Sequence, residues 1–269
     1  MILLVFAAAV AASNFFAPAL AEANHALVAG RLDQAQIMIA RAVASGASGD
    51  PVDRLLAQLA FARGQDEQAL ALSRGLLMNH PTNPLFAEQA GISALRLGRL
   101  VEATALLRAA TALPGASWRA WNALGAAADD RSDWALADTA YARARHLSPD
   151  RAEIANNRGW SLLLRGRWSE AEAELGRGLT LGSAAPAASR QRMTNNLQLA
   201  RAALATALPL RTTNESDEAW AARLNDAGVA AAMTGDRARA IAAFSSAIEA
   251  RPRWNGRAAT NLAAIEGQR

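Results

Sequence analysis

The sequence predicts an all-helical fold built from a repeated unit of two helices. The chain of 269 residues is 52% hydrophobic and only 5% aromatic, and its apolar residues are mostly Ala and Leu, which favour closely packed helices over sheets. A pattern of a Gly or Ser turn residue, an Ala five positions later and a usually bulky residue four positions after that recurs along the chain. Its first five copies are spaced by 34 residues, which is long enough for one helix-turn-helix unit.

Each element of the unit has a physical reason. The six copies of the pattern are Gly30-Ala35-Ile39, Gly64-Ala69-Ser73, Gly98-Ala103-Leu107, Ser132-Ala137-Tyr141, Gly166-Ala171-Leu175 and Gly235-Ala240-Phe244. A further glycine in the first helix leaves room for the second helix, and a proline ends the second helix because it cannot donate the next backbone hydrogen bond. These glycines are Gly91, Gly125, Gly159 and Gly228, and the prolines are Pro81, Pro149 and Pro252.

The best-formed unit, residues 118–151, resembles the tetratricopeptide-repeat (TPR) family. Its family positions hold Trp121, Leu124, Gly125, Ala137, Tyr141, Ala144 and Pro149, with Ser132 in place of the turn glycine. The resemblance implies an all-α helix-turn-helix solenoid, wound as a right-handed superhelix, that binds proteins and is not an enzyme.

The repeats divide the chain into five segments. Residues 22–183 form repeats 1–5, of which the first is truncated, and residues 218–254 form repeat 6. Between them, residues 184–217 are a spacer, because the turn glycines Gly166 and Gly235 are 69 residues apart, one more than two periods. Within it, residues 187–206 are expected to form one long helix and residues 212–217 a polar loop. Residues 255–269 are expected to form a capping helix.

The N-terminal segment, residues 1–21, has the features of an export signal. An uncharged apolar run over residues 2–12 precedes Pro18 and the small-residue pattern Ala19-Leu20-Ala21, so cleavage before Glu22 is expected. It would leave only residues 22–28 of the first helix. The alternative is an uncleaved anchor, since no basic residue precedes the run. A cleaved signal would place the protein in the periplasm, and an uncleaved anchor would hold it at the inner membrane.

Composition argues against several chemistries. The chain has no Cys, which excludes disulfides, zinc-thiolate sites and lipid attachment through Cys. All 28 basic residues are Arg, and they are interspersed with acids, so no nucleic-acid-binding stripe is expected. His25, His80 and His146 lie in different repeats without a nucleophile or metal-spaced cluster. We therefore expect no catalytic residues, metal or cofactor.

A partner-binding face is predicted on the first helices. Positions 2, 5, 9 and 12 of a first helix lie on one side by the 3.6-residue period, and the TPR resemblance implies that this side lines a concave groove for a protein or an extended peptide. Trp160 is either the anchor for a partner or a residue that packs between repeats. Asn122, Asn156 and Asn225 share one position, so these three residues form either a row of amides for a peptide backbone or ordinary solvated groups and caps between helices. We call these residues the first-helix face: Arg54, Gln58, Phe61, Glu88, Ile92, Leu95, Arg119, Asn122, Asp129, Glu153, Asn156, Trp160 and Leu163.

Two further resemblances bear on the partner. Arg54, Gln58, Gln89, Arg119 and Ala123 partly resemble the carboxylate clamp with which some TPR proteins hold a chaperone tail, with Gln in place of two Asn residues and no final basic residue. The run of residues 156–168 and the later Asn195-Asn196-Leu197 resemble the TadD-type component of tight-adherence (Flp) pilus assembly. That resemblance implies a scaffold for pilus biogenesis. The alternatives are a generic periplasmic TPR adaptor and a regulatory subunit of an envelope enzyme.

Overall fold

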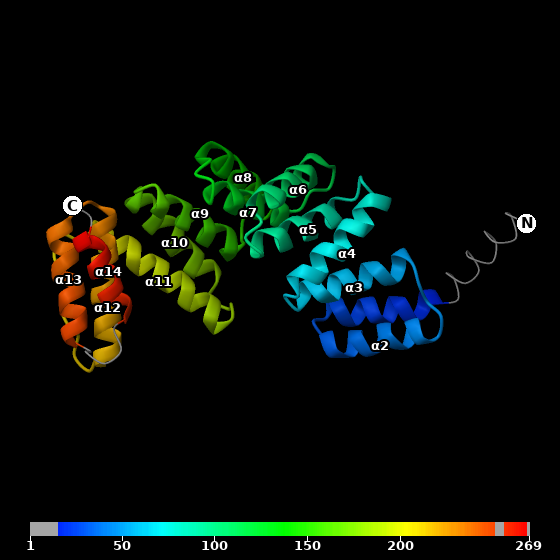
Figure 1. Cartoon of the computed structure of the whole chain (residues 1–269), viewed down its shortest axis with the longest axis horizontal. Helices are drawn as coiled ribbons and strands as arrows, with labels where there is room; N and C mark the ends of the chain where they lie inside the picture. Colours follow the sequence, from blue (N-terminus) through cyan, green and yellow to red (C-terminus); the bar gives the residue numbers. More distant parts are fainter. Residues whose placement is uncertain (1–15, 251–255, 268–269) are drawn as a thin grey trace, which may run out of the picture. The chain divides into compact units, whose positions relative to one another are not determined.

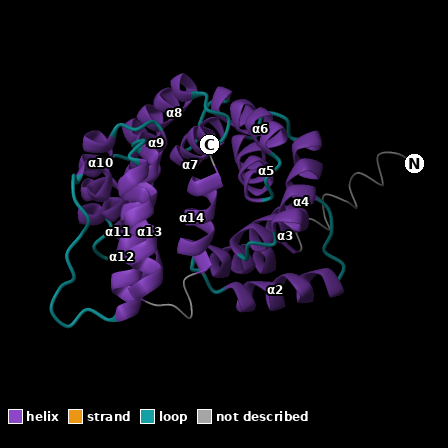
Figure 2. Cartoon of the chain, turned by 60° about the vertical axis from the view of Figure 1, so that its left-hand side comes forward, coloured by secondary structure: helices purple, strands orange, loops and turns teal. Residues whose placement is uncertain are grey.

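A computed structural model describes residues 16–250 and 256–267 of the chain. Every described segment is helix, turn or loop, so the all-helical prediction is confirmed over these residues (Figure 2). The chain divides into two compact units between Leu147 and Ser148. We describe each unit by itself.

The first unit is a series of antiparallel helices in which each packs against the next (Figure 1). Residues 16–28 are helical and precede the labelled helices. Helix α5 also contacts α7 and, through fewer residues, α3, so the first helices of successive repeats are neighbours. The labelled helices are α2 (Leu32–Ala44), α3 (Asp50–Ala62), α4 (Asp66–Asn79), α5 (Pro84–Arg96), α6 (Leu100–Ala112), α7 (Trp118–Asp129) and α8 (Trp134–Leu147).

The predicted turn positions share one backbone conformation. The five turn glycines have φ between 69° and 78°, the left-handed region that glycine tolerates best. Ser132 stands at the same position with φ 56°, so the repeat geometry holds even where the residue is not glycine. The 34-residue spacing therefore corresponds to a real repeat of local structure.

The glycines inside the first helices are sites of close helix approach, as predicted. A Cβ atom on Gly125 would lie 2.7 Å from Cε1 of Tyr141, and one on Gly228 would lie 2.5 Å from Cε1 of Phe244. Both aromatic rings are fully buried. The bulky residue of the second helix thus fills the space that the missing side chain leaves.

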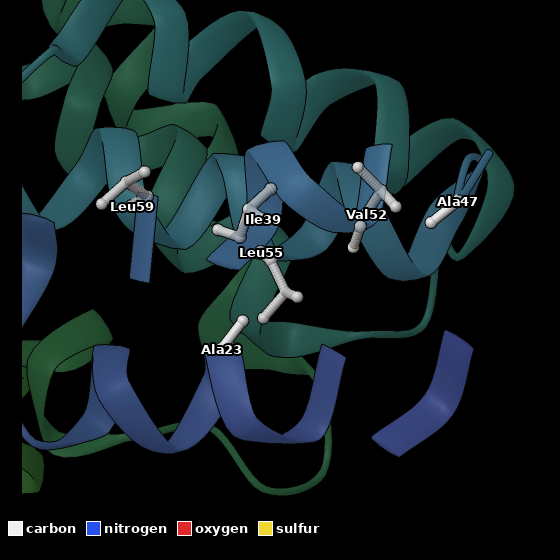
Figure 3. Close-up of a cluster of buried hydrophobic side chains, with 7 residues drawn as sticks. Ala23, Ile39, Ala47, Val52, Leu55 and Leu59 are labelled. Carbon is white, nitrogen blue, oxygen red and sulfur yellow. The ribbon is translucent and has the colours of Figure 1, made fainter. Parts of the chain in front are cut away.

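The first repeat uses residues that the expected cleavage would remove. Ala23, Ile39 and Leu55 form the middle of a buried apolar cluster in the first unit (Figure 3). Phe16 and Leu20, which precede the expected cleavage site, pack against this cluster. Residues 16–28 are one continuous helix, so cleavage before Glu22 would divide it. The rest of the predicted signal, residues 1–15, lies outside the described residues.

The second unit contains two groups of three helices (Figure 1). In the first group α11 packs against α9 and α10, and in the second α14 packs against α12 and α13. The expected long helix over residues 187–206 is α11, which ends at Leu204, and the expected cap over residues 255–269 contains α14. The helices are α9 (Ala152–Leu164), α10 (Trp168–Leu181), α11 (Ala187–Leu204), α12 (Asp217–Met233), α13 (Arg237–Ala250) and α14 (Gly256–Gly267).

Candidate functional site

The first-helix face begins on α3, where its three predicted residues differ in environment. Arg54 is exposed and Gln58 is half-buried. Phe61 is half-buried beneath the guanidinium of Arg96, whose Cζ lies 4.8 Å from the ring centre. Arg96 also binds the Asp66 carboxylate, with 3.1 Å between nitrogen and oxygen. Phe61 is therefore already covered in part by a cation of the chain itself.

Arg54 lines a cavity of about 240 Å³ where the ends of α3, α4 and α5 meet. Its walls include Asp50, His80 and Phe86. The carboxylate of Asp50 lies 2.5 Å from Nε2 of His80 and accepts a hydrogen bond of 3.1 Å from Asn79. These hydrogen bonds, led by that of His80, lower the pKa of Asp50. The pair joins the start of α3 to the end of α4.

Glu88 of α5 holds the start of α7 in place and is closed to a partner. Its side chain is buried, and its Oε2 accepts a hydrogen bond of 2.6 Å from the hydroxyl of Ser117. The same hydroxyl accepts hydrogen bonds from the backbone of Arg119 and Ala120 at the first turn of α7. Burial raises the pKa of the Glu88 carboxyl, while the Ser117 hydrogen bond and the charge of Arg119 lower it. We therefore remove Glu88 from the partner-binding face.

Asp129 of α7 is likewise a structural residue. It is buried and accepts a hydrogen bond of 2.7 Å from the hydroxyl of Tyr141. The remaining predicted residues of this unit are more open, since Arg119 is exposed and Ile92 and Asn122 are half-buried. The Oδ1 atom of Asn122 is buried without a hydrogen-bond partner. Arg119 is the exposed polar residue among these three, and its guanidinium lies over the Trp118 ring, with Cζ 4.8 Å from the ring centre.

The partial carboxylate clamp is not assembled. Gln89 and Ala123 are buried. The Oε1 atom of Gln89 makes no hydrogen bond and is shielded from solvent. Because Gln89 is only 5% exposed, Arg54 and Arg119 are the exposed members of this set, and the resemblance to the clamp stays partial.

Amide groups in the second unit pair with one another across helices. Asn196 of α11 donates a hydrogen bond of 3.0 Å from Nδ2 to Oδ1 of Asn156 on α9. Asn261 of α14 makes the same bond, 3.1 Å long, to Asn225 on α12. Of the two interpretations of the predicted amide row, these bonds favour links between helices. The partner asparagines could not be found from the repeat period, because they lie 40 and 36 residues further along the chain.

Trp160 of the first-helix face and Leu164, which lies outside the predicted set, are exposed apolar side chains of α9. Each is 40% exposed. Residues four apart in a helix differ by about 40° in direction, so Leu164 lies beside Trp160, as Glu153 and Asn157 do on the preceding turns. Leu163, three residues from Trp160, is instead fully buried against Leu175 of α10. Leu163 is therefore not accessible to a partner, and Leu164 is the accessible apolar side chain beside Trp160.

Over residues 16–250 and 256–267 the structure offers no metal site and no membrane span. It contains no group of three or more His, Asp or Glu side chains placed to hold a metal ion. No helix within these residues is both long and apolar enough to cross a membrane. On the first-helix face, Glu88, Asp129 and Asn156 make hydrogen bonds within the chain. Arg54, Arg119 and Glu153 are exposed to solvent.

Comparisons with known proteins agree with this architecture. Residues 123–189 match the family model described as tetratricopeptide repeat. No curated protein matches the chain in sequence. The solved structures described next are 12–16% identical to this chain, so their likeness to it shows the fold alone.

Three solved structures share the fold. PilW, described as a widely conserved type IV pilus biogenesis factor, is 16% identical with a TM-score of 0.54 over 94% of this chain and 98% of its own. Pseudomonas aeruginosa PilF is 14% identical with a TM-score of 0.53 over 96% and 100%. The anaphase-promoting complex hetero-tetramer Cut9–Hcn1 is 12% identical with a TM-score of 0.54 over 91% of this chain, which spans only 41% of the chain it matches. The protein therefore has the all-α TPR helical-repeat fold, and its central residues 123–189 match the tetratricopeptide-repeat family in sequence.

Proposed function

We propose that this protein is a non-catalytic scaffold of the bacterial cell envelope that binds an extended segment of a partner protein. The observation that carries the proposal is the exposed pair Trp160 and Leu164 on α9. A large, rigid Trp side chain at a surface is a typical source of binding energy in protein interfaces. Two apolar side chains one helical turn apart would hold one or two apolar side chains of the partner.

The neighbours of Trp160 favour a peptide segment over a charged ligand. Asn157 continues the same stripe of α9 and is half-buried, and the amide pair of Asn156 and Asn196 lies alongside. The amide of Asn157 suits the main chain of an extended peptide, whereas Asn156 and Asn196 are bonded to each other. Glu153 is the charged member of this stripe and is exposed. An apolar anchor bordered by an amide and by one carboxylate therefore fits an apolar segment that is not acidic.

We further propose that the envelope process is assembly of a tight-adherence (Flp) pilus. The features of residues 1–21 support export, and the resemblance of residues 156–168 to the TadD-type component supports a pilus role. The fold likeness to PilW extends over nearly the full length of both chains and is consistent with such a role. Genes for a prepilin, a pilus ATPase and a secretin beside this gene would support the proposal, and their absence would favour a general periplasmic adaptor or a subunit that regulates an envelope enzyme.

The binding face is tested with peptides selected from a random display library on the purified chain. A selected peptide is titrated against Trp160→Ala and against Trp134→Ala, whose Trp is half-buried at the start of α8. Truncation of a Trp anchor costs about 2 kcal/mol or more, so we expect Trp160→Ala to weaken binding by about thirtyfold or more. Trp134→Ala should leave the affinity unchanged, with both variants equally helical by circular dichroism. Equal losses in the two variants would exclude the α9 face.

A further inference from the structure

The second unit contains a cavity where the repeat period breaks. It measures about 300 Å³ and lies between α11, the segment that follows it, α12 and α13. Its size is at the lower end of the roughly 300–1,000 Å³ range of small-molecule sites. The floor is made by small apolar residues that leave the space unfilled, namely Ala202, Ala205, Ala207, Pro209 and Ala227.

Three arginines from three different helices line this cavity. Arg201 comes from α11, Arg223 from α12 and Arg239 from α13. Arg201 donates from Nε to Glu172, and Arg223 binds Glu215 through Nε and Nη2. These bonds fix the two guanidinium groups at the wall. The convergence of three positive groups on an apolar floor does not follow from the TPR repeat.

Arg239 carries an unsatisfied donor in this wall. Its side chain is only 12% exposed, and its Nε is buried without a hydrogen bond, 3.5 Å from an oxygen of Asp236. Its other nitrogens donate to the backbone oxygen of Ala205 and to the hydroxyl of Thr234. That N–H group is shielded from solvent and lies beside the Asp236 carboxylate, so Arg239 is a guanidinium held in place by the chain and not a free donor for a ligand.

One acid faces the same cavity. Asp226 of α12 is half-buried, and burial raises the pKa of its carboxyl, against the hydrogen bond from Asn225 and the charge of Arg257. Its negative charge is therefore less favoured here than in water. Three arginines and this one acid line the cavity, and each arginine also pairs with a carboxylate outside the lining, namely Glu172, Glu215 and Asp236.

We propose that this cavity binds a carboxylate carried on a short apolar chain. The chain would lie on the alanine and proline floor, and the carboxylate would accept hydrogen bonds from the arginine wall, which suits planar oxyanions. A medium-chain fatty acid and the C-terminal residue of a peptide both present this chemistry. The site does not involve the first-helix face, so it is independent of the function proposed above.

The test uses calorimetric titration of the full chain with four probes. Octanoate is compared with octanol, and the free acid of acetyl-Ala-Ala-Leu is compared with its amide. We expect at least one acid to bind and its uncharged counterpart to bind at least about tenfold more weakly, the loss expected for charge-assisted hydrogen bonds. Binding of octanoate alone identifies a fatty-acid site, and binding of the peptide acid identifies a C-terminus site. Equal binding of acid and neutral probe, or no binding of either acid, would overturn the proposal.

Variants locate the binding. Arg201→Gln changes a side chain that is 62% exposed, so the substitution should leave the fold intact. We expect it to lower the affinity for the acid about tenfold. The control Arg192→Gln changes an exposed arginine of the same helix outside the cavity. Ala202→Leu should block binding by filling the floor, and Asp226→Asn should strengthen it. Trp160→Ala should have no effect, which separates this site from the peptide face. Binding that survives both Arg201→Gln and Ala202→Leu unchanged would show that the acid binds elsewhere.

Discussion

Replacing Gly125 by Ala should destabilise the fourth repeat by much more than an ordinary surface change. The new Cβ would lie 2.7 to 2.9 Å from three atoms of the Tyr141 ring. That ring is 1% exposed, and its hydroxyl is held by the buried Asp129 at 2.7 Å, so it cannot withdraw without breaking this hydrogen bond. Overpacking of this kind costs about 3 kcal/mol at the upper end of its usual range, and the better helix propensity of Ala returns about 1 kcal/mol. The expected net loss is about 2 kcal/mol.

The matched control is Gly75→Ala in α4. No atom of a neighbour lies within 4 Å of a Cβ placed on Gly75, so only the helix propensity changes and the variant should gain up to about 1 kcal/mol. Because the chain has two units and global unfolding need not be two-state, the measurement is native-state hydrogen exchange resolved by helix. Protection in α7 and α8 should fall only in Gly125→Ala. If the two variants changed stability in the same direction and by the same amount, close packing at Gly125 would not be the reason for its glycine.

Two other expectations can be checked by stability measurements. Asp50→Asn should lower stability near neutral pH and lose its effect in acid: the folded pKa of Asp50 is lowered, so its contribution is present above the unfolded pKa of about 3.9 and is lost as pH falls through the folded pKa. Unfolding curves of the two proteins from pH 7 to pH 2 should therefore converge, and a constant gap would contradict the contact with His80 as its source. A chain that begins at Glu22 should exchange amide hydrogens faster in α2 and α3 than a chain that begins at Phe16, because Phe16 and Leu20 pack on their shared cluster; equal protection would show that this packing is dispensable and that cleavage before Glu22 is compatible with a stable first repeat.

The repeated part of the fold could be predicted from sequence because it is encoded locally. A turn residue, a close-packing glycine and a bulky residue recur at fixed spacing, and each acts on its own two helices. Ser132 shows the limit of a strict motif, since it adopts the same left-handed conformation as the glycines it replaces. The pairing of Asn156 with Asn196 could not be predicted, because no periodic relation connects these positions.

The binding face was predicted less accurately than the repeats because of helix geometry. Counting positions 9 and 12 selects residues three apart, which differ by about 60° in direction, so the count passes from Trp160 at the surface to the buried Leu163. Glu88 and Asp129 were chosen by the same count and are held inside by a hydroxyl group from a neighbouring helix. The position of a polar residue on a helix therefore does not predict whether its side chain is exposed, because a hydrogen-bond partner from elsewhere in the chain can hold it in the interior.

The break in the repeat explains why a cavity arises beside α12. In a regular unit the second helix supplies a bulky residue that fills the space beside the first-helix glycine, as Phe244 does at Gly228. Helix α11 is followed by residues 205–216, which form no helix, and the residues they present to the cavity are two alanines and a proline. The cavity beside this segment is thus lined by small side chains and by arginines of α11, α12 and α13. A departure from the repeat period is therefore the position at which a solenoid of closely packed helices can acquire a pocket with its own chemistry.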